Sequence, residues 1–453
     1  MALRPYQSRM LMDVERGFVQ GHKKLCLQLP TGGGKTVIAA GLISHPHLLR
    51  GRVLYIVPSD EILKQTEDML ESAKVSYVVV HGPGVGKSIG GVRVVLTTSQ
   101  TLQRRMGAVS FAGYTPDAII YDEAHKLIEQ HRSVQKRWPR AVAIGLTATP
   151  VRLDGKSLAA LFPVLICGPS ISGLQKAGWL VSARTVPATM PDLSRIKMVA
   201  GDYDAGALDA AYGDEALVQE IVDWWRVDGR RRRTITFAAG IHASKRLVAA
   251  YNRAGARAEH LDGGTSKEVR KDALDRLRRG ELDVVCNVGL FVEGLDLVEV
   301  SCVQLATATC SLSRYMQMVG RGLRPAPHVN KRDLVIIDHG GNSDRHGMVD
   351  AERDWYADGA ISARRLCEDC NEPVDVDGQT VCTPHLKARL AAAEPAPMRR
   401  QRQERAESLR TPYRNCPAWA KSVRETWERS ERARVAAGLP LWYSEQQCKR
   451  EIA

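Results

Sequence analysis

Short apolar runs alternate with stretches of helical periodicity along the first part of the chain. Apolar runs of this length are typical of strands, and a regular alternation of strands and helices is typical of an α/β layer built on a parallel sheet. The clearest predicted strands in this part are residues 53–57, 92–96, 119–121 and 142–146. The pattern therefore predicts a first α/β domain.

A second alternation of the same kind follows a less regular stretch that contains several Gly and Pro residues, which predicts a connector. Its strands are predicted at 234–238, 284–287, 302–305 and 334–338. From about residue 391 the chain is polar and rich in Ala, Arg and Glu, which is typical of exposed helix or linker. The predicted fold class is therefore α/β, with two parallel-sheet domains in tandem. The predicted division is 1–168 for the first domain, 169–213 for the connector, 214–345 for the second domain, 346–390 for a small module and 391–453 for a basic helical tail.

A glycine-rich segment follows the first apolar run, residues 25–29, and precedes a predicted helix. Its glycines remove side chains, so backbone N–H groups can surround phosphate oxygens. Lys35 would reach the β- and γ-phosphates, and the Thr36 hydroxyl would bind Mg²⁺. Leu29 stands where the general pattern has Gly, and a plain Gly-rich turn is the alternative. The candidate nucleotide-binding residues of this segment are Thr31, Gly32, Gly33, Gly34, Lys35 and Thr36.

An acidic tetrapeptide, residues 122–125, ends the apolar run 118–121. Asp122 is predicted to hold Mg²⁺ through water, and Glu123 to orient and deprotonate an attacking water. His125 is too far along for that chemistry and is predicted to couple the site to a neighbouring segment. An acidic cap between a strand and a helix is the alternative, but together with the glycine-rich segment the tetrapeptide predicts hydrolysis of a nucleoside triphosphate.

The composition predicts the kind of binding partner and the cellular compartment. The chain has 453 residues and a formal net charge of +13, which favours a polyanionic partner. It has no apolar run long enough to cross a membrane and no N-terminal secretion signal. Most of the 10 cysteines lie inside apolar runs, which predicts reduced thiols and a cytoplasmic protein.

Several further segments, in this order, resemble the motifs of the superfamily 2 helicases and translocases of the DEAD/H type. The resemblance covers about residues 3–325 and includes the DEAH sequence at 122–125. It implies two RecA-like domains, ATP as the nucleotide and a nucleic-acid partner, with DNA favoured over RNA and single-stranded or forked DNA over other forms. The segments that carry it are 3–7, 57–59, 97–99, 146–150, 287–296 and 317–324.

The resemblance also implies roles for single residues. The residues implied to contact the nucleotide are Arg4, Gln7, Gly294 and Asp296, and those implied to contact the nucleic-acid backbone are Pro58, Ser59, Thr97, Thr98 and Asn287. His125, Thr147 and Thr149 are implied to couple hydrolysis to domain movement. Gln317, Arg321 and Arg324 belong to the arginine-finger motif. No local acid neutralises the last two arginines in the sequence. Across a cleft they would stabilise charge on the γ-phosphate, with Arg324 as the finger and Arg321 as a phosphate contact. A solvated basic helix is the alternative for this segment.

Two residue pairs beyond the second domain predict a zinc site. Cys367 and Cys370 form one pair and Cys382 and His385 the other, a donor set that suits tetrahedral Zn²⁺. A disulfide and a coincidence are the alternatives, and Cys416 is a possible substitute for His385. A helicase core followed by such a cysteine-rich module is similar to RadD-like bacterial helicases and related phage proteins, which implies a bacterial or phage-infected cell.

The tail combines arginines with Trp419, Trp427 and Trp442, which would either stack on bases or form a helical cap on the core. The predicted function is an ATP-dependent helicase or translocase moving along a nucleic-acid strand. A motor on duplex DNA, including a restriction-type subunit, is an alternative within this class. An ATP-gated clamp or annealing factor is the alternative from another class, and the second α/β domain argues against a small-molecule enzyme. Protein partners are not predicted.

Overall fold

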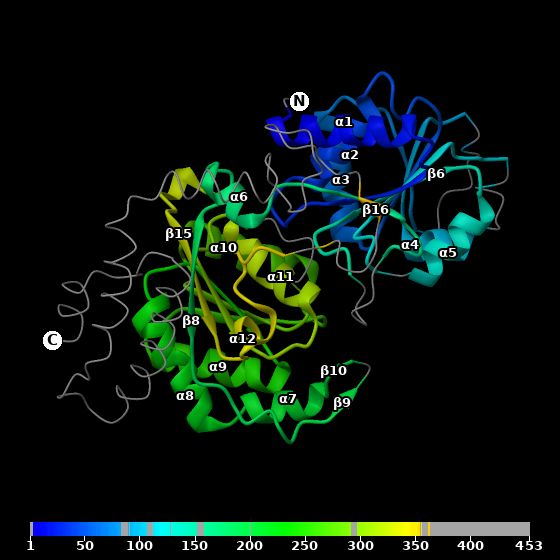
Figure 1. Cartoon of the computed structure of the whole chain (residues 1–453). Helices are drawn as coiled ribbons and strands as arrows, with labels where there is room; N and C mark the ends of the chain where they lie inside the picture. Colours follow the sequence, from blue (N-terminus) through cyan, green and yellow to red (C-terminus); the bar gives the residue numbers. More distant parts are fainter. Residues whose placement is uncertain are drawn as a thin grey trace, which may run out of the picture.

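The fold is described from a computed structural model of the chain (Figure 1). The structure describes residues 3–82, 89, 91–106, 111, 113–126, 128–151, 158–199, 201–290, 297–353, 355 and 361–362. The predicted zinc ligands Cys367, Cys370, Cys382 and His385, the predicted nucleotide contacts Gly294 and Asp296, and the tail all lie outside these residues.

The first domain is an eight-stranded sheet in the order β16-β7-β1-β6-β5-β2-β4-β3, and every neighbouring pair is parallel. Its central strands are buried along their whole length, as expected for a parallel sheet covered on both faces. The strands are β1 (Lys24–Gln28), β2 (Val53–Val57), β3 (Val78–Val80), β4 (Val94–Thr98), β5 (Ala118–Asp122), β6 (Val142–Thr147), β7 (Val164–Cys167) and β16 (Ile361–Ser362).

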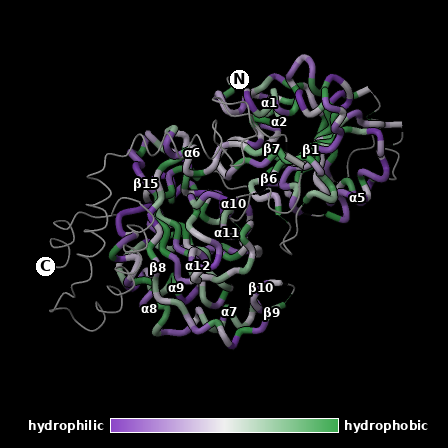
Figure 2. The backbone as a smooth tube through the Cα atoms, in the orientation of Figure 1, coloured by the Kyte–Doolittle hydropathy of each residue, from purple (hydrophilic) through white to green (hydrophobic). Residues whose placement is uncertain are grey.

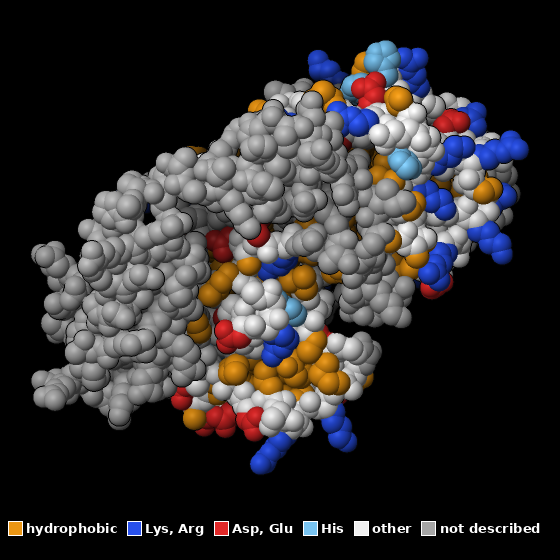
Figure 3. Space-filling model, in the orientation of Figure 1, with side chains coloured by type: hydrophobic (Ala, Val, Ile, Leu, Met, Phe, Trp, Pro, Cys, Tyr) orange, Lys and Arg blue, Asp and Glu red, His pale blue; other side chains and the backbone are white. Residues whose placement is uncertain are grey.

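Helices cover both faces of this sheet. One apolar cluster joins the strands to α1 (Pro5–Val19), α2 (Lys35–Ser44) and α3 (Asp60–Ser72). A separate cluster joins them to α4 (Ser99–Arg105) and α5 (Ile128–Arg137). Figure 2 shows the hydrophobic stretches lying along the central strands, and Figure 3 shows Lys and Arg side chains spread over the visible surface of this domain.

The second domain is a six-stranded parallel sheet in the order β12-β13-β11-β14-β15-β8. Its strands are β8 (Ser182–Pro187), β11 (Thr234–Ala238), β12 (Ala258–Leu261), β13 (Val284–Asn287), β14 (Cys302–Ala306) and β15 (Asp333–Asp338). Its helices are α6 (Ile171–Lys176), α7 (Ala205–Tyr212), α8 (Glu215–Trp224), α9 (Ile241–Arg253), α10 (Lys267–Arg279), α11 (Leu312–Gly320) and α12 (Asn342–His346). A small antiparallel hairpin, β9 (Met198–Val199) and β10 (Asp202–Tyr203), precedes α7.

Two parallel-sheet α/β domains are thus confirmed. The stretch expected to be a connector is more ordered than its composition suggests, because β8 pairs with β15 at the edge of the second sheet. The chain also returns to the first domain after the second: Trp355 packs against the first domain's core, and β16 pairs with β7.

Three smaller observations bear on the sequence predictions. None of the described helices is long and apolar enough to cross a membrane. In the part of the chain that the structure describes, Cys26, Cys167, Cys286 and Cys302 are buried and are not part of a disulfide, as expected for reduced thiols. Among the described residues, no group of three or more His, Cys, Asp or Glu side chains is arranged to hold a metal ion. The zinc site therefore stays a prediction on residues beyond this part of the chain.

Candidate nucleotide site between the two domains

The glycine-rich loop joins β1 to α2 and presents the amino end of that helix, where backbone N–H groups favour an anion. Gly32 and Gly34 have φ values of +85° and +86°, a region that favours glycine. A Cβ on Gly33 would come within 2.7 Å of the Leu29 side chain. Leu29, the departure from the general pattern, is buried beneath the loop and leaves its shape intact.

Side chains of helix α1 form hydrogen bonds with this loop. The hydroxyl of Tyr6 donates to the carbonyl of Gly33 at 2.7 Å, and Nε2 of Gln7 donates to the same carbonyl at 3.2 Å. Oε1 of Gln7 accepts from the backbone N–H of Arg4, and the Gln7 side chain is buried. Nε2 of Gln7 therefore helps to position the loop, whereas Oε1 caps the first turn of α1. The role of Gln7 at the adenine edge stays a prediction.

Arg4 contacts the second domain, and its contact with a nucleotide stays a prediction. Its guanidinium carbon lies 4.5 Å from the centre of the Trp179 ring, and Nη1 donates to the Tyr6 hydroxyl at 2.9 Å. Tyr6 packs against the cores of both domains, and Trp179 packs against the core of the second. These two aromatic residues were not predicted, although Tyr6 lies directly before Gln7 in the same motif.

The acidic residues lie at the carboxyl end of β5. Nζ of Lys35 lies 3.3 Å from Oε1 of Glu123, so the loop lysine and the predicted base form an ion pair. Oδ1 of Asp122 accepts from the backbone N–H of Glu123 at 3.0 Å. Glu123 has a φ of +47°, which costs a non-glycine residue about 1–2 kcal/mol. Strain of this kind concentrates at functional sites.

Burial and charge move the two carboxyl groups in opposite directions. Burial and the neighbouring charge of Glu123 raise the pKa of Asp122 to about 6. Burial is the largest single influence on Glu123 and disfavours its ionisation, but Lys35 and the other basic groups nearby together outweigh burial, so the pKa of Glu123 is lowered. Oε2 of Glu123 is buried and accepts no hydrogen bond from the described residues, which leaves it free to accept one from a water.

The same residues fit a magnesium ion. Asp122 is a buried carboxylate whose raised pKa reports a negative charge that nearby groups do not fully compensate. Thr36, in the first turn of α2, adds a hydroxyl oxygen. Carboxylate and hydroxyl oxygens are donors that Mg²⁺ prefers.

His125 joins the two domains. Nδ1 lies 2.9 Å from Oγ1 of Thr147, and Nε2 lies 2.9 Å from Oγ of Ser313 on α11. Nε2 of Gln317, also on α11, lies 3.4 Å from the same ring nitrogen. Because Thr147 donates its own hydroxyl hydrogen to the carbonyl of Thr149, it accepts from Nδ1–H of His125. Nε2 is then the acceptor for Ser313.

This assignment agrees with the charge state of the ring. Burial lowers the pKa of His125 to about 4, so the imidazole is neutral near pH 7 and has one donor and one acceptor nitrogen. The predicted partners His125 and Thr147 are brought together. Ser313 was not predicted, although it precedes Gln317 by four residues and so lies on the same face of a helix.

The second domain also reaches the glycine-rich loop. A Cβ on Gly320 would lie 2.5 Å from Cβ of Thr31, and a Cβ on Gly32 would lie 3.0 Å from Cγ of Arg324. The positive charge of Arg321 contributes to a lowered pKa of Lys126, next to His125, although burial is the larger cause. The predicted arginine motif therefore lies directly against the predicted phosphate loop.

The residues predicted to contact the nucleic-acid backbone differ in exposure. Pro58 and Ser59 are partly exposed, with Ser59 capping α3. Thr98 caps α4. Thr97 and Asn287 are fully buried and donate to the carbonyls of Val80 and Thr236, at 2.8 and 3.2 Å. Both side chains therefore bond to the protein's own backbone, and their contact with nucleic acid stays a prediction.

Two family models match the chain over these two domains. The model described as type III restriction enzyme, res subunit, matches residues 1–152, and the helicase conserved C-terminal domain matches residues 214–326. The chain belongs to superfamily 2 of the helicases. The two matches divide this superfamily 2 helicase much as its two sheets do.

Individual relatives agree. A 51.5 kDa protein of a Lactococcus phage is 25% identical over 76% of this chain and 74% of its own length. The Saccharomyces cerevisiae protein IRC3, named as an ATP-dependent helicase, is 26% identical over 84% of this chain, which spans only 55% of IRC3. In fold, the chain resembles a fragment of an HsdR-type subunit of a type I restriction enzyme from Vibrio vulnificus, with a TM-score of 0.60, 21% identity, and coverage of 82% of this chain and 70% of that one.

Proposed function

We propose that this superfamily 2 protein is a nucleic-acid-dependent ATPase that couples hydrolysis between its two domains to movement along a DNA strand. The observation that carries the proposal is the contact of Gly320 and Arg324 with Thr31 and Gly32. It makes the phosphate loop and the arginine motif parts of one site, although they belong to different domains. The match of the first domain to a restriction-enzyme family supports DNA over RNA.

The ion pair of Lys35 with Glu123 suggests how the site is activated. The bound magnesium ion would neutralise phosphate charge and be held by Asp122 and Thr36. When Lys35 turns to the phosphates, Glu123 loses the largest of the charges that lower its pKa. Burial then raises that pKa, so Glu123 becomes a stronger base for the water it orients through Oε2. Arg324 would stabilise charge on the γ-phosphate, which is worth about 10³–10⁵ in rate.

Coupling follows from what the same segment touches. Release of the γ-phosphate would remove the contact of Arg324 and let the domains separate. The bonds of His125 to Ser313 and Gln317 connect α11 to the acidic residues, so they would respond to that separation. A strand held on both domains would then be displaced by one step in each cycle.

The decisive experiment measures ATPase rates with single-stranded DNA, duplex DNA, forked DNA and RNA. Stimulation by single-stranded or forked DNA of at least tenfold is expected, with a weaker effect of RNA. A rate that no nucleic acid changes would refute the motor proposal. Strand displacement separates a motor from a clamp, because a clamp would show ATP-dependent binding without displacement.

A further inference from the structure

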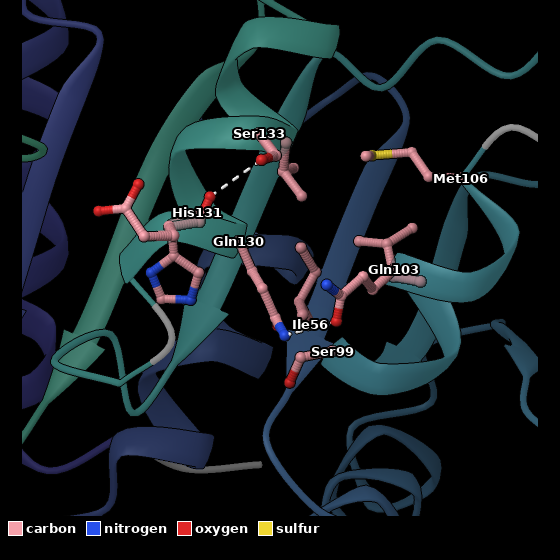
Figure 4. A pocket seen from close by; sticks show the side chains of 10 residues that line it. Ile56, Ser99, Gln103, Met106, Gln130, His131 and Ser133 are labelled. Atoms are coloured by element: carbon pink, nitrogen blue, oxygen red, sulfur yellow. Dashed lines mark hydrogen bonds between the residues drawn. The ribbon is translucent and has the colours of Figure 1, made fainter.

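A pocket opens between α4 and α5 on the first domain (Figure 4). Its walls include the buried apolar side chains of Ile56, Leu102 and Val134. The side chains of Gln103 and Gln130 approach each other from the two helices, and Nε2 of Gln130 donates to Oε1 of Gln103 at 2.8 Å. The pocket therefore combines apolar walls with amide groups.

Two polar atoms in this lining lack partners among the described residues. They are Nδ1 of His131 and Oε1 of Gln130, and both atoms are buried. The His131 side chain is only 4% exposed. A buried polar atom left without a hydrogen bond costs about 1–3 kcal/mol. Such atoms in a pocket wall are the groups that a ligand with its own donors and acceptors would satisfy.

The charges around the pocket select a neutral ligand. Burial lowers the pKa of His131 to about 4, so the ring is uncharged near pH 7. The charged lining residue is Glu129, at the rim, which pairs with Arg132 at 3.1 Å. An anion would find no cation among the lining residues. Cations lie just outside, at the last turns of the two helices: Arg104, Arg105, Lys136 and Arg137.

The position of the pocket, next to two segments predicted to contact nucleic acid, indicates which molecule supplies the ligand. Ser99, in the lining, directly follows Thr98, and Ile56 lies two residues before Pro58. Both segments are proposed backbone contacts. We propose that this pocket accepts one unstacked nucleobase of the bound strand, while the surrounding cations hold its phosphates. The inference rests on the proposed function, and it adds a base contact to a motor otherwise expected to hold only the backbone.

A scan with abasic nucleotides tests the pocket. A single abasic site is moved along a short single-stranded DNA, and its affinity for the full chain is measured. One position is expected to weaken binding about tenfold, within the range for one stacked base. Gln130→Ala and the pocket-filling Ser133→Trp should weaken binding of intact DNA and abolish the dependence on that position. Gln135→Ala, on the same helix but outside the lining, should keep it.

Two outcomes would overturn the pocket: no sensitive position in the unmodified protein, or the same sensitivity in both pocket variants. The second result would place the base contact elsewhere. An absence of sensitivity would leave the pocket to another occupant, such as a side chain of a protein partner. ATPase stimulation by the same intact DNA keeps these failures distinct from failure of the proposed function.

Discussion

The imidazole Nε2 of His125 accepts a hydrogen bond from the hydroxyl of Ser313, 2.9 Å away and 188 residues later in the chain. It joins the acidic tetrapeptide of one domain to α11 of the other, the helix that leads into the arginine motif. A neutral ring with a free acceptor is required, and burial supplies it by holding the pKa of His125 near 4.

Ser313→Ala removes this bond at a cost of about 1 kcal/mol. The rate stimulated by nucleic acid should fall about fivefold, and more than the basal rate, because the contact joins the domains rather than the reacting atoms. Steady-state ATPase with and without single-stranded DNA measures both rates. Ser72→Ala, which removes a surface hydroxyl of α3, is the control. An equal loss in both rates would show that Ser313 serves the site itself.

Glu123→Gln should retain ATP binding and lower turnover by about 10²–10⁴, the range of a general base. The amide cannot take a proton, and it also loses the charge that pairs with Lys35. Nucleotide affinity from a fluorescent ATP analogue and single-turnover hydrolysis measure the two effects separately. Retained turnover would remove Glu123 as the base.

Gly34→Ala should abolish nucleotide binding, because its Cβ would lie 2.5 Å from Nε2 of Gln7 and displace the link between α1 and the loop. Gly21→Ala is a matched control. Gly21 has a similar φ of +84°, but its Cβ would meet nothing within 4 Å. Both variants should lose a similar stability from the unfavourable φ, about 1 kcal/mol. Only the first should lose ATP affinity, and equal affinities would contradict the role of Gln7.

Lys331 positions the segment that carries Arg324. Its Nζ donates to the carbonyls of Arg324 and Val298, both at 2.8 Å, and burial with the charge of Arg324 lowers its pKa to about 7. Lys331→Met keeps the stem and removes both bonds. The kcat for ATP should fall about tenfold with a smaller change in KM, since the arginine acts mainly in the transition state. Lys271→Met, at an exposed pair on α10, should leave kcat unchanged.

Stability should fall as the pH drops below about 6.5. Burial lowers the pKa of His125, His131 and His339 to about 4, so the unfolded chain binds these protons more readily than the folded one. Each should cost about 1 kcal/mol between pH 7 and 5.5. Asp122, with its pKa raised to about 6, opposes the trend as one group against three.

The melting temperature across this pH range measures the effect. His339→Gln should start lower at pH 7.5 and lose less on acidification, because one of the three groups is gone. A melting temperature that is the same at pH 7.5 and 5.5 would contradict the burial of these rings.

Strands whose own residues form a clear apolar pattern could be predicted from the sequence. The strands at Thr234–Ala238 and Val284–Asn287 have the predicted bounds because each is a short run of mostly apolar and β-branched residues that are all buried. β8 was missed because it is an edge strand whose first three residues are exposed or half-exposed, so its sequence is mixed. β16 has two residues and exists only through its partner β7, which no local pattern can reveal.

The candidate site also has parts that a local sequence pattern predicts and parts that depend on the tertiary structure. The glycine-rich loop was predictable because its chemistry lies within seven consecutive residues. The predicted roles of Gln7 and Thr97 came from motifs, and a motif reports neither burial nor hydrogen bonding. The structure adds that both side chains are buried and hydrogen bonded within the protein. The contact of Ser313 with His125 depends on how the two domains meet, which sequence spacing alone does not specify.

Within the described residues the chain crosses between the domains twice, and these two crossings lie together. It leaves the first core at Cys167, enters the second at Ile171, leaves that core at Val349 and rejoins the first at Trp355. The hydroxyl of Ser170 on one crossing donates to Glu352 on the other at 2.9 Å. Two covalent tethers at one place form a pivot. Rotation about that pivot can open and close the opposite side, whereas sliding one domain past the other would stretch both tethers. In the proposed cycle, the domain movement would therefore be a rotation about a fixed centre, and the displacement of a bound nucleic-acid strand would depend on its distance from Ser170.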